Sequence, residues 1–479
     1  MYKSTRNSKL RVSSYEAIVQ GLSDEGGLFV PDIFPSLDYH SLINMSYQQI
    51  TVEILHLFFP EFSIHELEVI VHNGYDNNFK GSLCEIKDFE RFSVLELYHG
   101  PTCAFKDMAL TIFPHLYEAS KKHLNITSSS TILTATSGDT GGACLSGFYN
   151  SENTNVIVLY PNDGISKIQE RQMHSFASSR NKVIAFDGNF DDCQNFVKEI
   201  FTDSEYKKYN LSSANSINIG RLVPQIVYYY YAYLHLLSTN KIYDGERINV
   251  CVPTGNFGDI LASYYAKKMG LPIAKFVCAS NQNNVLADFF ETGKYDRNRK
   301  FYTSISPSMD ILISSNLERL LYDLSSDEYV NHLMKDLKET GRYQVSKELK
   351  NRLSDFIGSS LTEEETRQTI KNTFDDKGYL IDPHTSVALG CYQKTKMFYH
   401  TVIVSTAHPY KFPVSVLKSL GEMETDEFKA ITKLEMLTKV VNIDNIEKLK
   451  DVQIHKTIWN KENAKEKIKE LLEEERCIK

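Results

Sequence analysis

From about residue 92 onward the chain repeats one pattern, in which a short apolar segment is followed by a turn and then by a helical segment. The clearest apolar segments are SVLELYHG (93–100), TILTAT (131–136), NVIVLYP (155–161) and INVCVP (248–253). Strands that alternate with helices predict a parallel sheet whose faces are covered by helices. Ligands of such sheets bind beyond the carboxyl ends of the strands. The loops that follow these strands are therefore where we expect functional residues.

The first 90 residues lack this alternation and show helical patterns joined by turns. SYQQITVEILHLFFP (46–60) has the pattern of a helix, and DEGG (24–27) is a turn. A chain of 479 residues is too long for one compact core, so two or three domains are expected. We expect a mainly helical N-terminal domain over residues 1–90.

Composition and charge exclude several classes of protein. The formal net charge is -8, so a broad basic surface for nucleic acid is absent. The longest apolar-aromatic run, residues 222–237, is shorter than the roughly 20 residues that a membrane-spanning helix needs. Gln225 and His235 also interrupt this run, so we expect a helix in the core and no membrane partner. The N-terminus does not resemble a signal peptide.

Eight cysteines are spread along the chain, and no two of them form a CxxC pair. This spacing disfavours a zinc ribbon or a thioredoxin-like motif. Cys251 and Cys278 lie in apolar segments, as buried free thiols do. Such cysteines suit a reducing compartment, and we predict a cytoplasmic protein without a bound metal.

The loop TGNFGD (254–259) follows a predicted strand and begins a helical segment. Its glycines let backbone N–H groups turn inward, and the helix adds the positive end of its dipole, so the loop suits a phosphate group. Neither the GK[ST] of a nucleotide P-loop nor a GxGxxG fingerprint is present. By itself, this loop is equally well explained as a glycine-rich turn without a bound anion.

The loop SGDTGGA (137–143) has the same position between a strand and a helix. Ser137 and Thr140 offer hydroxyl groups, and the loop N–H groups can bind a carboxylate. By itself, the segment is better explained as a capped helix start, with Asp139 or Thr140 as the cap.

The segment HGPTCAFKDMAL (99–110) places Lys106 at or near the first turn of a helix. A lysine there lacks the favourable interaction that cations have with a helix C-terminus, and burial between Phe105 and Met108 would lower its pKa further. A lysine with a lowered pKa is a usable nucleophile and base. The alternative is a surface lysine, which the local sequence alone favours.

Two more segments carry polar residues at predicted strand ends. In STAHPYKF (405–412), Thr406 is expected at the ligand edge of the sheet, with Lys411 beyond it. In PNDGISKIQERQM (161–173), Lys167 and Arg171 could meet a second anion. A capped strand end and solvent-exposed cations explain these segments equally well.

Seven motifs together show a resemblance to a known family that no single loop shows by itself. In chain order they are DEGGLFVP (24–31), HGPTCAFKD (99–107), ATSGDTGGA (135–143), LYPNDGISKIQERQM (159–173), NSINIGRLVPQ (215–225), PTGNFGD (253–259) and STAHPYKF (405–412). The chain resembles the threonine synthase family, of the longer type with an N-terminal domain, from its first residues to about residue 420. That family belongs to the fold-type-II pyridoxal-phosphate enzymes and is similar to the tryptophan synthase β chain.

The resemblance implies an α/β fold with two open parallel or mixed sheets flanked by helices. It implies a large cofactor-binding domain over residues 91–125 and 205–479, and a small α/β domain over residues 126–204. Lys106 is then expected to hold pyridoxal 5'-phosphate as a Schiff base and, once freed by the substrate amine, to act as the catalytic base. The residues expected to bind the rest of the cofactor are Gly255, Asn256, Phe257, Gly258 and Asp259 at the phosphate, and Thr406 at the pyridine nitrogen.

The resemblance also implies where the substrate binds. The substrate carboxylate is expected at Ser137, Gly138, Asp139 and Thr140. Many fold-type-II enzymes have Asn where this chain has Asp139. The candidate cations for the substrate phosphate are Lys167, Arg171, Arg221 and Lys411.

The implied reaction converts O-phospho-L-homoserine and water to L-threonine and phosphate, in the cytoplasm, by a monomer or homodimer. One alternative is a threonine-synthase-like phospho-lyase that releases 2-oxobutyrate and phosphate from the same substrate. Another is a non-catalytic binding protein that keeps the fold. The HGPT and LYPNDGISKIQ segments favour the synthase, and the presence of Lys106 argues against the binding protein.

Overall fold

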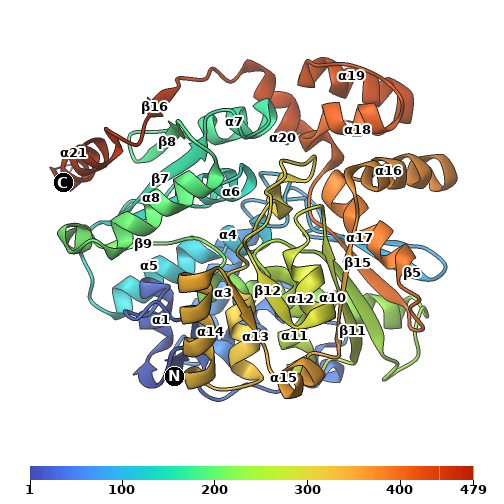
Figure 1. Ribbon diagram of the computed structural model, residues 1–479, viewed down its shortest axis with the longest axis horizontal. Coiled ribbons are helices and arrows are strands. Elements are labelled where there is room, and N and C mark those ends of the chain that lie inside the picture. The colour runs from blue at the N-terminus through green and yellow to red at the C-terminus, as the bar shows by residue number, and fades with distance from the viewer. Residues whose placement is uncertain (442, 478–479) are drawn as a thin grey trace.

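The computed structural model describes residues 1–441 and 443–477, which are arranged around two main sheets (Figure 1). The strands of the larger sheet are β4 (Glu85–Asp88), β5 (Phe92–Glu96), β10 (Ile248–Pro253), β11 (Ile273–Ser280), β14 (Phe356–Ser360) and β15 (Thr401–Ser405). Their order is β14-β11-β10-β15-β5-β4. Neighbouring strands pair in parallel, except that β4 is antiparallel to β5.

The strands of the smaller sheet are β6 (Ser130–Ala135), β7 (Thr154–Pro161), β8 (Asn181–Phe186), β9 (Leu211–Ser212) and β16 (Thr457–Trp459). Their order is β16-β8-β7-β6-β9, and all pairs are parallel. Every residue of β6 and β7 is buried, because helices cover both faces. The predicted parallel, helix-covered architecture is thus confirmed in both sheets.

Helices pack on each sheet. The helices of the unit that contains the larger sheet are α4 (Asp107–Leu110), α5 (Phe113–His123), α9 (Ile219–Leu222), α10 (Val227–Ser238), α11 (Gly258–Met269), α12 (Val285–Thr292), α13 (Leu317–Asp323), α14 (Asp327–Thr340), α15 (Lys347–Arg352), α16 (Glu363–Lys377), α17 (Pro383–Lys394), α18 (Pro413–Ser419), α19 (Glu427–Thr438) and α20 (Asp444–Glu447). Those of the smaller sheet are α6 (Asp139–Gly147), α7 (Lys167–His174), α8 (Phe190–Thr202) and α21 (Ala464–Cys477). A short antiparallel pair, β12 (Lys294–Asp296) and β13 (Arg342–Gln344), stands apart.

The N-terminal region contains a sheet that the sequence did not predict. Its elements are β1 (Tyr2–Ser4), β2 (Asn7–Val12), α1 (Ser14–Gln20), β3 (Phe29–Pro31), α2 (Tyr47–Phe58) and α3 (Ile64–Tyr75). The three strands are antiparallel, in the order β2-β1-β3. Capping boxes at Ser13 and Ser46 start α1 and α2. The fully buried Arg319 holds this region to the rest, since it donates to the carbonyls of Phe29 and Ile217.

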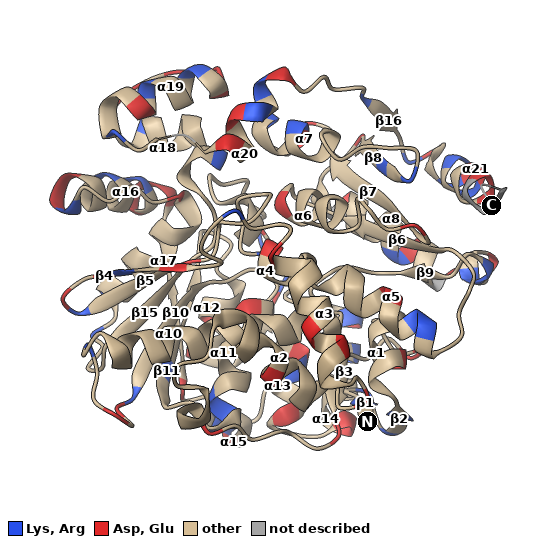
Figure 2. Cartoon of the chain, turned by 180° about the vertical axis from the view of Figure 1, so that it is seen from behind, with Lys and Arg blue, Asp and Glu red and all other residues tan. Residues whose placement is uncertain are grey.

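The aromatic run at residues 222–237 forms a core helix, as predicted. It begins as a 3-10 turn over Val223–Ile226 and continues as α10. The tyrosines at positions 228, 229, 230 and 233 are almost completely buried. None of the helices in the described part of the chain is both long enough and apolar enough to cross a membrane. Figure 2 shows Lys and Arg interspersed with Asp and Glu along the outer helices α16, α19 and α21.

The structure places four segments differently from the expected domain division. β9, which was expected with the large domain, pairs with β6 of the smaller sheet. β4 joins the larger sheet although it precedes residue 91. β16 and α21, which were expected with the large domain, pack on the smaller sheet (red and green in Figure 1). Apolar burial explains this position of β16 and α21, because Trp459, Ile468 and Leu472 share a core with strands β6, β7 and β8. The smaller unit is therefore completed by the end of the chain.

This packing predicts the effect of truncating one buried side chain of α21. Ile468 is 0% exposed, so Ile468→Ala should lower the free energy of unfolding by about 2–4 kcal/mol. Denaturant unfolding can be followed by Trp459, the single tryptophan of the chain, which lies in the same core. Ile458→Ala is the matched control, since Ile458 is 48% exposed and its loss should cost less than about 0.5 kcal/mol. Equal effects of the two variants would contradict the docking of α21.

Candidate active site

Lys106 lies where two strand-end loops of the larger sheet meet. It directly precedes α4, at the end of the loop that leaves β5. The N–H of Phe105 donates to the carbonyl of Thr406 at 2.8 Å, and Ala104 and Ala407 form an antiparallel bridge. The two loops are neighbours because β5 and β15 pair in parallel and end at the same edge. The structure therefore brings Lys106 and Thr406 together, although they are far apart in the sequence.

One carboxylate and two lysines form the buried centre of this site. Asp139, at the start of α6, accepts a hydrogen bond from Lys106 Nζ at 3.2 Å on Oδ2, and its Oδ1 lies 2.9 Å from Lys411 Nζ. Lys411 is 0% exposed, Asp139 2% and Lys106 8%. Lys411 also donates to the carbonyl of Thr102 and to Oε1 of Gln172. A single carboxylate is thus shared by two ammonium groups.

Burial and charge act in opposite directions on this group. Burial lowers the pKa of Lys106, and although Asp139 opposes this, the charges of Lys411 and Arg221 add to the lowering. Burial would raise the pKa of Asp139, but the attraction of Lys106 and Lys411 outweighs burial and holds that pKa well below its usual range. The site therefore keeps an ionised carboxylate beside a lysine that releases its proton more readily than a surface lysine does.

Asp139 has two further donors that the sequence analysis missed. Gln169 Nε2 donates to Oδ1 at 2.9 Å, and Ser308 Oγ donates to Oδ2 at 3.3 Å. Gly138 makes the approach of Gln169 possible, since its φ is +125° and an added Cβ would lie 2.4 Å from that side chain. Gln169 falls inside one of the seven motifs, so a signal for it existed. Ser308 lies outside all of them, and no sequence signal pointed to it.

The loop after β6 leaves two hydroxyl groups available. Thr136 Oγ1 accepts from the N–H groups of Gly138 and Gly141 and so shapes the turn. In the described part of the chain, no hydrogen bond is recorded for the hydroxyl of Ser137 or of Thr140, and both side chains are half-buried. Both stand at the N-terminus of α6, where the helix dipole favours an anion.

The loop after β10 presents unpaired backbone donors. Among the described residues, no acceptor is recorded for the N–H of Asn256, Phe257 or Gly258. Phe257 has a φ of +63°, and α11 starts directly after it. At Gly255, an added Cβ would lie 2.5 Å from the carbonyl oxygen of Ser308, so only glycine fits. Three N–H groups without an acceptor at a helix N-terminus suit an anionic ligand.

The side chain of Asp259 has a different place from the expected one at the cofactor phosphate. Its Oδ1 accepts from the hydroxyls of Tyr228 at 2.6 Å and Tyr229 at 2.5 Å. It therefore joins α11 to α10. A carboxylate would also repel a phosphate, which leaves the backbone of residues 256–258 as the anion-binding part of the loop.

Two of the four candidate phosphate cations have partners elsewhere. Lys167 is exposed and faces Glu427, which accepts from its backbone N–H. Arg171 donates to the carbonyls of residues 449 and 450 and lies 5.0 Å above the ring of Phe428. Both residues hold the C-terminal segment, residues 427–450, onto α7. The structure does not bring them to Lys106, because α7 turns this face toward residues 427–450.

Arg221 differs from these two cations. It is 4% exposed, its Nη1 donates to the carbonyl of Ala214 at 2.8 Å, and its Nε has no partner within the described residues. Burial lowers the pKa of the guanidinium to about 10. Its charge also lowers the pKa of Lys106, and α9, which contains Arg221, packs against α4, which follows Lys106. A buried cation with an unpaired N–H close to the lysine suits an anionic ligand.

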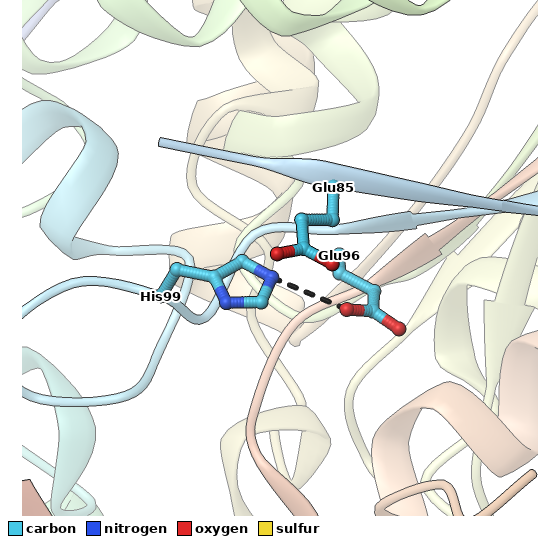
Figure 3. A group of neighbouring side chains, drawn as sticks. All are labelled: Glu85, Glu96 and His99. Carbon is cyan, nitrogen blue, oxygen red and sulfur yellow. Dashed lines mark hydrogen bonds and ion pairs between the residues drawn. The ribbon is translucent and has the colours of Figure 1, made fainter. Parts of the chain in front are cut away.

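Glu85, Glu96 and His99 form a second polar group, on the loop side of β5. Figure 3 shows His99 turned toward Glu96, at 3.2 Å from Nε2 to Oε2. One ligand atom from each residue lies within 4.8 Å of the others, a spacing that could suit a metal ion. Glu96 is already engaged, because its Oε1 accepts from Tyr379 at 2.6 Å. Burial would raise the pKa of Glu96, but its bonds with His99 and Tyr379 outweigh burial and lower it. Because Glu96 is the last residue of β5, these two bonds hold the start of the Lys106 loop.

Comparisons with known proteins agree with this geometry. Residues 1–75 match the family model described as threonine synthase N terminus, and residues 90–402 match the model described as pyridoxal-phosphate dependent enzyme. Threonine synthase of Saccharomyces cerevisiae is 36% identical to this chain, over 98% of this chain and 99% of its own length. Human threonine synthase-like 1 is 38% identical, over 86% of this chain and 58% of its own length.

A solved structure extends the similarity to the whole fold. The crystal structure of pyridoxal-phosphate-bound threonine synthase from Brucella melitensis matches with a TM-score of 0.86 and 34% identity. The match covers 99% of this chain and 98% of that chain. Both sheets and the N-terminal region therefore have counterparts in one enzyme.

The shared carboxylate predicts a large stability cost when one lysine is removed. Lys411→Met takes one of two cations from the buried Asp139, and the free energy of unfolding should fall by about 3–5 kcal/mol. Urea unfolding of the cofactor-free protein, followed by circular dichroism, measures this cost. Lys167→Met makes the same substitution at an exposed lysine and should cost less than about 0.5 kcal/mol. A similarly small cost for Lys411→Met would refute the shared-carboxylate arrangement.

The burial of Asp259 predicts that the stability of the protein depends on pH. Burial raises its pKa to about 6, above the ordinary value near 4, so the folded protein holds this proton more tightly than the unfolded chain. Ionising Asp259 in the folded protein therefore lowers the free energy of unfolding, and this loss grows as the pH rises between these two pKa values. Asp259→Asn removes that cost, and its stability relative to the native sequence should rise by about 2 kcal/mol between pH 4.5 and pH 7.

Urea unfolding at the two pH values measures this difference. The exposed Asp163→Asn is the control and should show no such rise. A relative stability of Asp259→Asn that stays constant or falls with pH would show that Asp259 does not carry the buried proton.

Proposed function

The chain belongs to the threonine synthase family of pyridoxal-phosphate-dependent enzymes, and from this premise we propose how its own residues convert O-phospho-L-homoserine and water to L-threonine and phosphate. It is a pyridoxal-phosphate-dependent lyase with the type II fold. The single observation that supports the mechanism best is Lys106, buried beside an ionised carboxylate and between two anion-binding loops.

The residues of the site fit pyridoxal phosphate. The unpaired N–H groups of Asn256, Phe257 and Gly258 would hold the phosphate, which needs several donors. Lys106 would provide the amine for the cofactor aldehyde, and the hydroxyl of Thr406 would face the pyridine nitrogen. When bound, the cofactor supplies a conjugated system that stabilises negative charge on the α-carbon of the substrate amino acid.

Lys106 is the group that we propose moves protons. Burial favours its neutral amine, which can accept the proton from the α-carbon of the substrate. Asp139 stabilises the ammonium form that results, at 3.2 Å. While Lys106 is neutral, Lys411 keeps Asp139 paired, so neither state leaves a lone buried charge. In the overall reaction one proton leaves the β-carbon and phosphate leaves the γ-carbon, the hydroxyl of water adds to the β-carbon, and the γ-carbon gains a proton. The proton taken from the α-carbon is returned to it.

The two ends of the substrate would be bound by different segments, the loop before α6 and helix α9. The free hydroxyls of Ser137 and Thr140, at the N-terminus of α6, would receive the carboxylate. Arg221 would bind the phosphate, which is supported by its burial, its unpaired Nε and its effect on the pKa of Lys106. We do not assign this role to Lys411, whose Nζ already has three partners.

We also propose a cytoplasmic location and a monomer or homodimer. The location is supported by the seven cysteines whose side chains are described, all of which are buried and unpaired. Cys477, the eighth, has a side chain outside the described part. Sedimentation of the purified protein measures the assembly.

The proposed reaction is tested by identifying products. Purified protein loaded with pyridoxal phosphate and given O-phospho-L-homoserine should release L-threonine and phosphate in equal amounts. Phosphate with 2-oxobutyrate would support the phospho-lyase instead. No release of phosphate would support a binding protein.

Lys106→Ala should lose turnover and the bound-cofactor spectrum together. Loss of the base should lower kcat by about 1,000-fold or more, within the range of general acid–base effects. The absorbance at about 410–430 nm that a lysine-bound cofactor gives should also vanish. Lys167→Ala, at an exposed lysine, should change neither quantity. Survival of the absorbance band in Lys106→Ala would mean that another residue holds the cofactor.

Arg221→Met should weaken substrate binding. A charge-assisted contact to phosphate is worth about 1.5–3 kcal/mol, so KM should rise about 10- to 100-fold. Inorganic phosphate should inhibit the variant correspondingly less. Arg171→Met removes a cation that holds the C-terminal segment and should leave KM within about twofold. An unchanged KM in a folded Arg221→Met protein would rule out this phosphate site.

A further inference from the structure

Ser308 touches both halves of the active site, although none of the seven motifs contains it. It lies in the 3-10 turn Pro307–Met309, and its carbonyl oxygen is 2.5 Å from where a Cβ on Gly255 would be. Its hydroxyl donates to Oδ2 of Asp139 at 3.3 Å. Gly255 follows a strand of the larger sheet and Asp139 a strand of the smaller sheet. The position of Ser308 therefore affects the spacing between the two loops.

A buried histidine holds Ser308 from a third side. The N–H of Ser308 donates to Nε2 of His384 at 3.2 Å. His384 is 2% exposed, lies in the first turn of α17, and packs on the ring of Phe412 with 4.9 Å between ring centroids. Nε2 can accept this hydrogen bond only while it carries no proton.

Asp382 selects the tautomer of the neutral imidazole. Its Oδ2 lies 2.7 Å from Nδ1 of His384, so Nδ1 carries the hydrogen and Nε2 is the acceptor. Asp382 is 0% exposed and accepts in addition from the N–H of His384 and from the N–H and hydroxyl of Thr385. Asp310, from the segment of Ser308, is a further charged group that interacts with His384. The imidazole thus presents a fixed acceptor to Ser308.

We propose that His384 is a positioning residue of this active site, which holds Ser308 against Gly255 and Asp139 and so sets the spacing between the cofactor phosphate loop and the substrate loop. His384 acts through Ser308, since its recorded hydrogen bonds go to Asp382 and Ser308 and reach neither Lys106 nor Asp139. The substrate part of this inference rests on the proposed function. The cofactor part does not, because cofactor affinity is measured without turnover.

Two amide variants test the role, since they differ by one methylene group. In His384→Gln the amide oxygen reaches the place of Nε2 and can still accept from Ser308. In His384→Asn the amide reaches only the place of Nδ1, so Asp382 keeps a donor but Ser308 loses its acceptor. His384→Asn should weaken the affinity of the apoenzyme for pyridoxal phosphate about tenfold and raise KM for O-phospho-L-homoserine by a similar factor, with kcat changed less. His384→Gln should stay within about twofold of the native sequence in both quantities.

The dissociation constant of pyridoxal phosphate is measured by fluorescence titration, and folding by the Trp459 unfolding transition. Equal effects of the Asn and Gln variants, or no effect of either, would overturn the proposal. His115→Asn is the control, at a histidine of α5 outside the site, and should leave cofactor affinity unchanged.

A second variant leaves His384 in place. Ser308→Ala removes only the hydroxyl that reaches Asp139, and it should raise KM several-fold while the unfolding midpoint is unchanged. If His384→Asn does not fold, Ser308→Ala becomes the deciding variant. An unchanged KM in Ser308→Ala then overturns the proposal. Should the native protein make no threonine, the proposed function fails, and the Asn and Gln comparison of cofactor affinity still decides the role of His384.

Discussion

The site depends on one buried carboxylate that is shared by two lysines. Asp139 comes from the smaller sheet, whereas Lys106 and Lys411 come from two loops of the larger sheet. A lone charge of this burial would be strongly unfavourable, so the three groups stabilise one another only when both sheets are folded and docked. The second lysine has a consequence for catalysis as well. In the proposed mechanism Lys106 changes its protonation state while Lys411 keeps Asp139 paired.

Parallel sheets explain why the functional loops converge. The strands before Lys106, Gly255 and Thr406 are neighbours in one sheet and end at one edge, while the strand before Asp139 ends at the corresponding edge of the other. Segments outside these loops then hold the arrangement from behind. Ser308, with His384 behind it, packs against Gly255 in the loop after β10, and the Glu96–His99 bond holds the start of the Lys106 loop.

Much of the fold could be predicted because local sequence patterns reflect it directly. Buried parallel strands are short apolar runs, the loops after them contain the glycines, and the aromatic helix at residues 222–237 is apolar around most of its circumference. The N-terminal sheet was missed because strands β1 and β3 have three residues each, too few to show an alternating pattern. The docking of α21 was missed because its partner core lies more than 200 residues earlier in the chain.

The candidate site also combines features that the sequence predicted with features that only the fold revealed. Motif order pointed to Lys106, Asp139, Thr406 and the loop at residues 254–259, all of which the fold gathers at the sheet edges. Four cations looked alike in the sequence, yet Lys167 is exposed, Arg171 holds the C-terminal segment, Lys411 pairs with Asp139, and Arg221 keeps an unpaired N–H. Gln169, Ser308 and His384 gained a place in the site only through tertiary contacts.

The sequence by itself indicated the type of sheet through its alternating pattern. The resemblance carried by seven ordered motifs implied the family, the cofactor and the lysine expected to hold it. Only the tertiary structure decided which charge meets which partner. On sequence grounds Asp139 could be a helix cap or a substrate ligand. Folding buries it between Lys106 and Lys411, which makes it their counterion. Burial and distance set the strength of a charge interaction, and both are properties of the assembled fold that no local pattern contains.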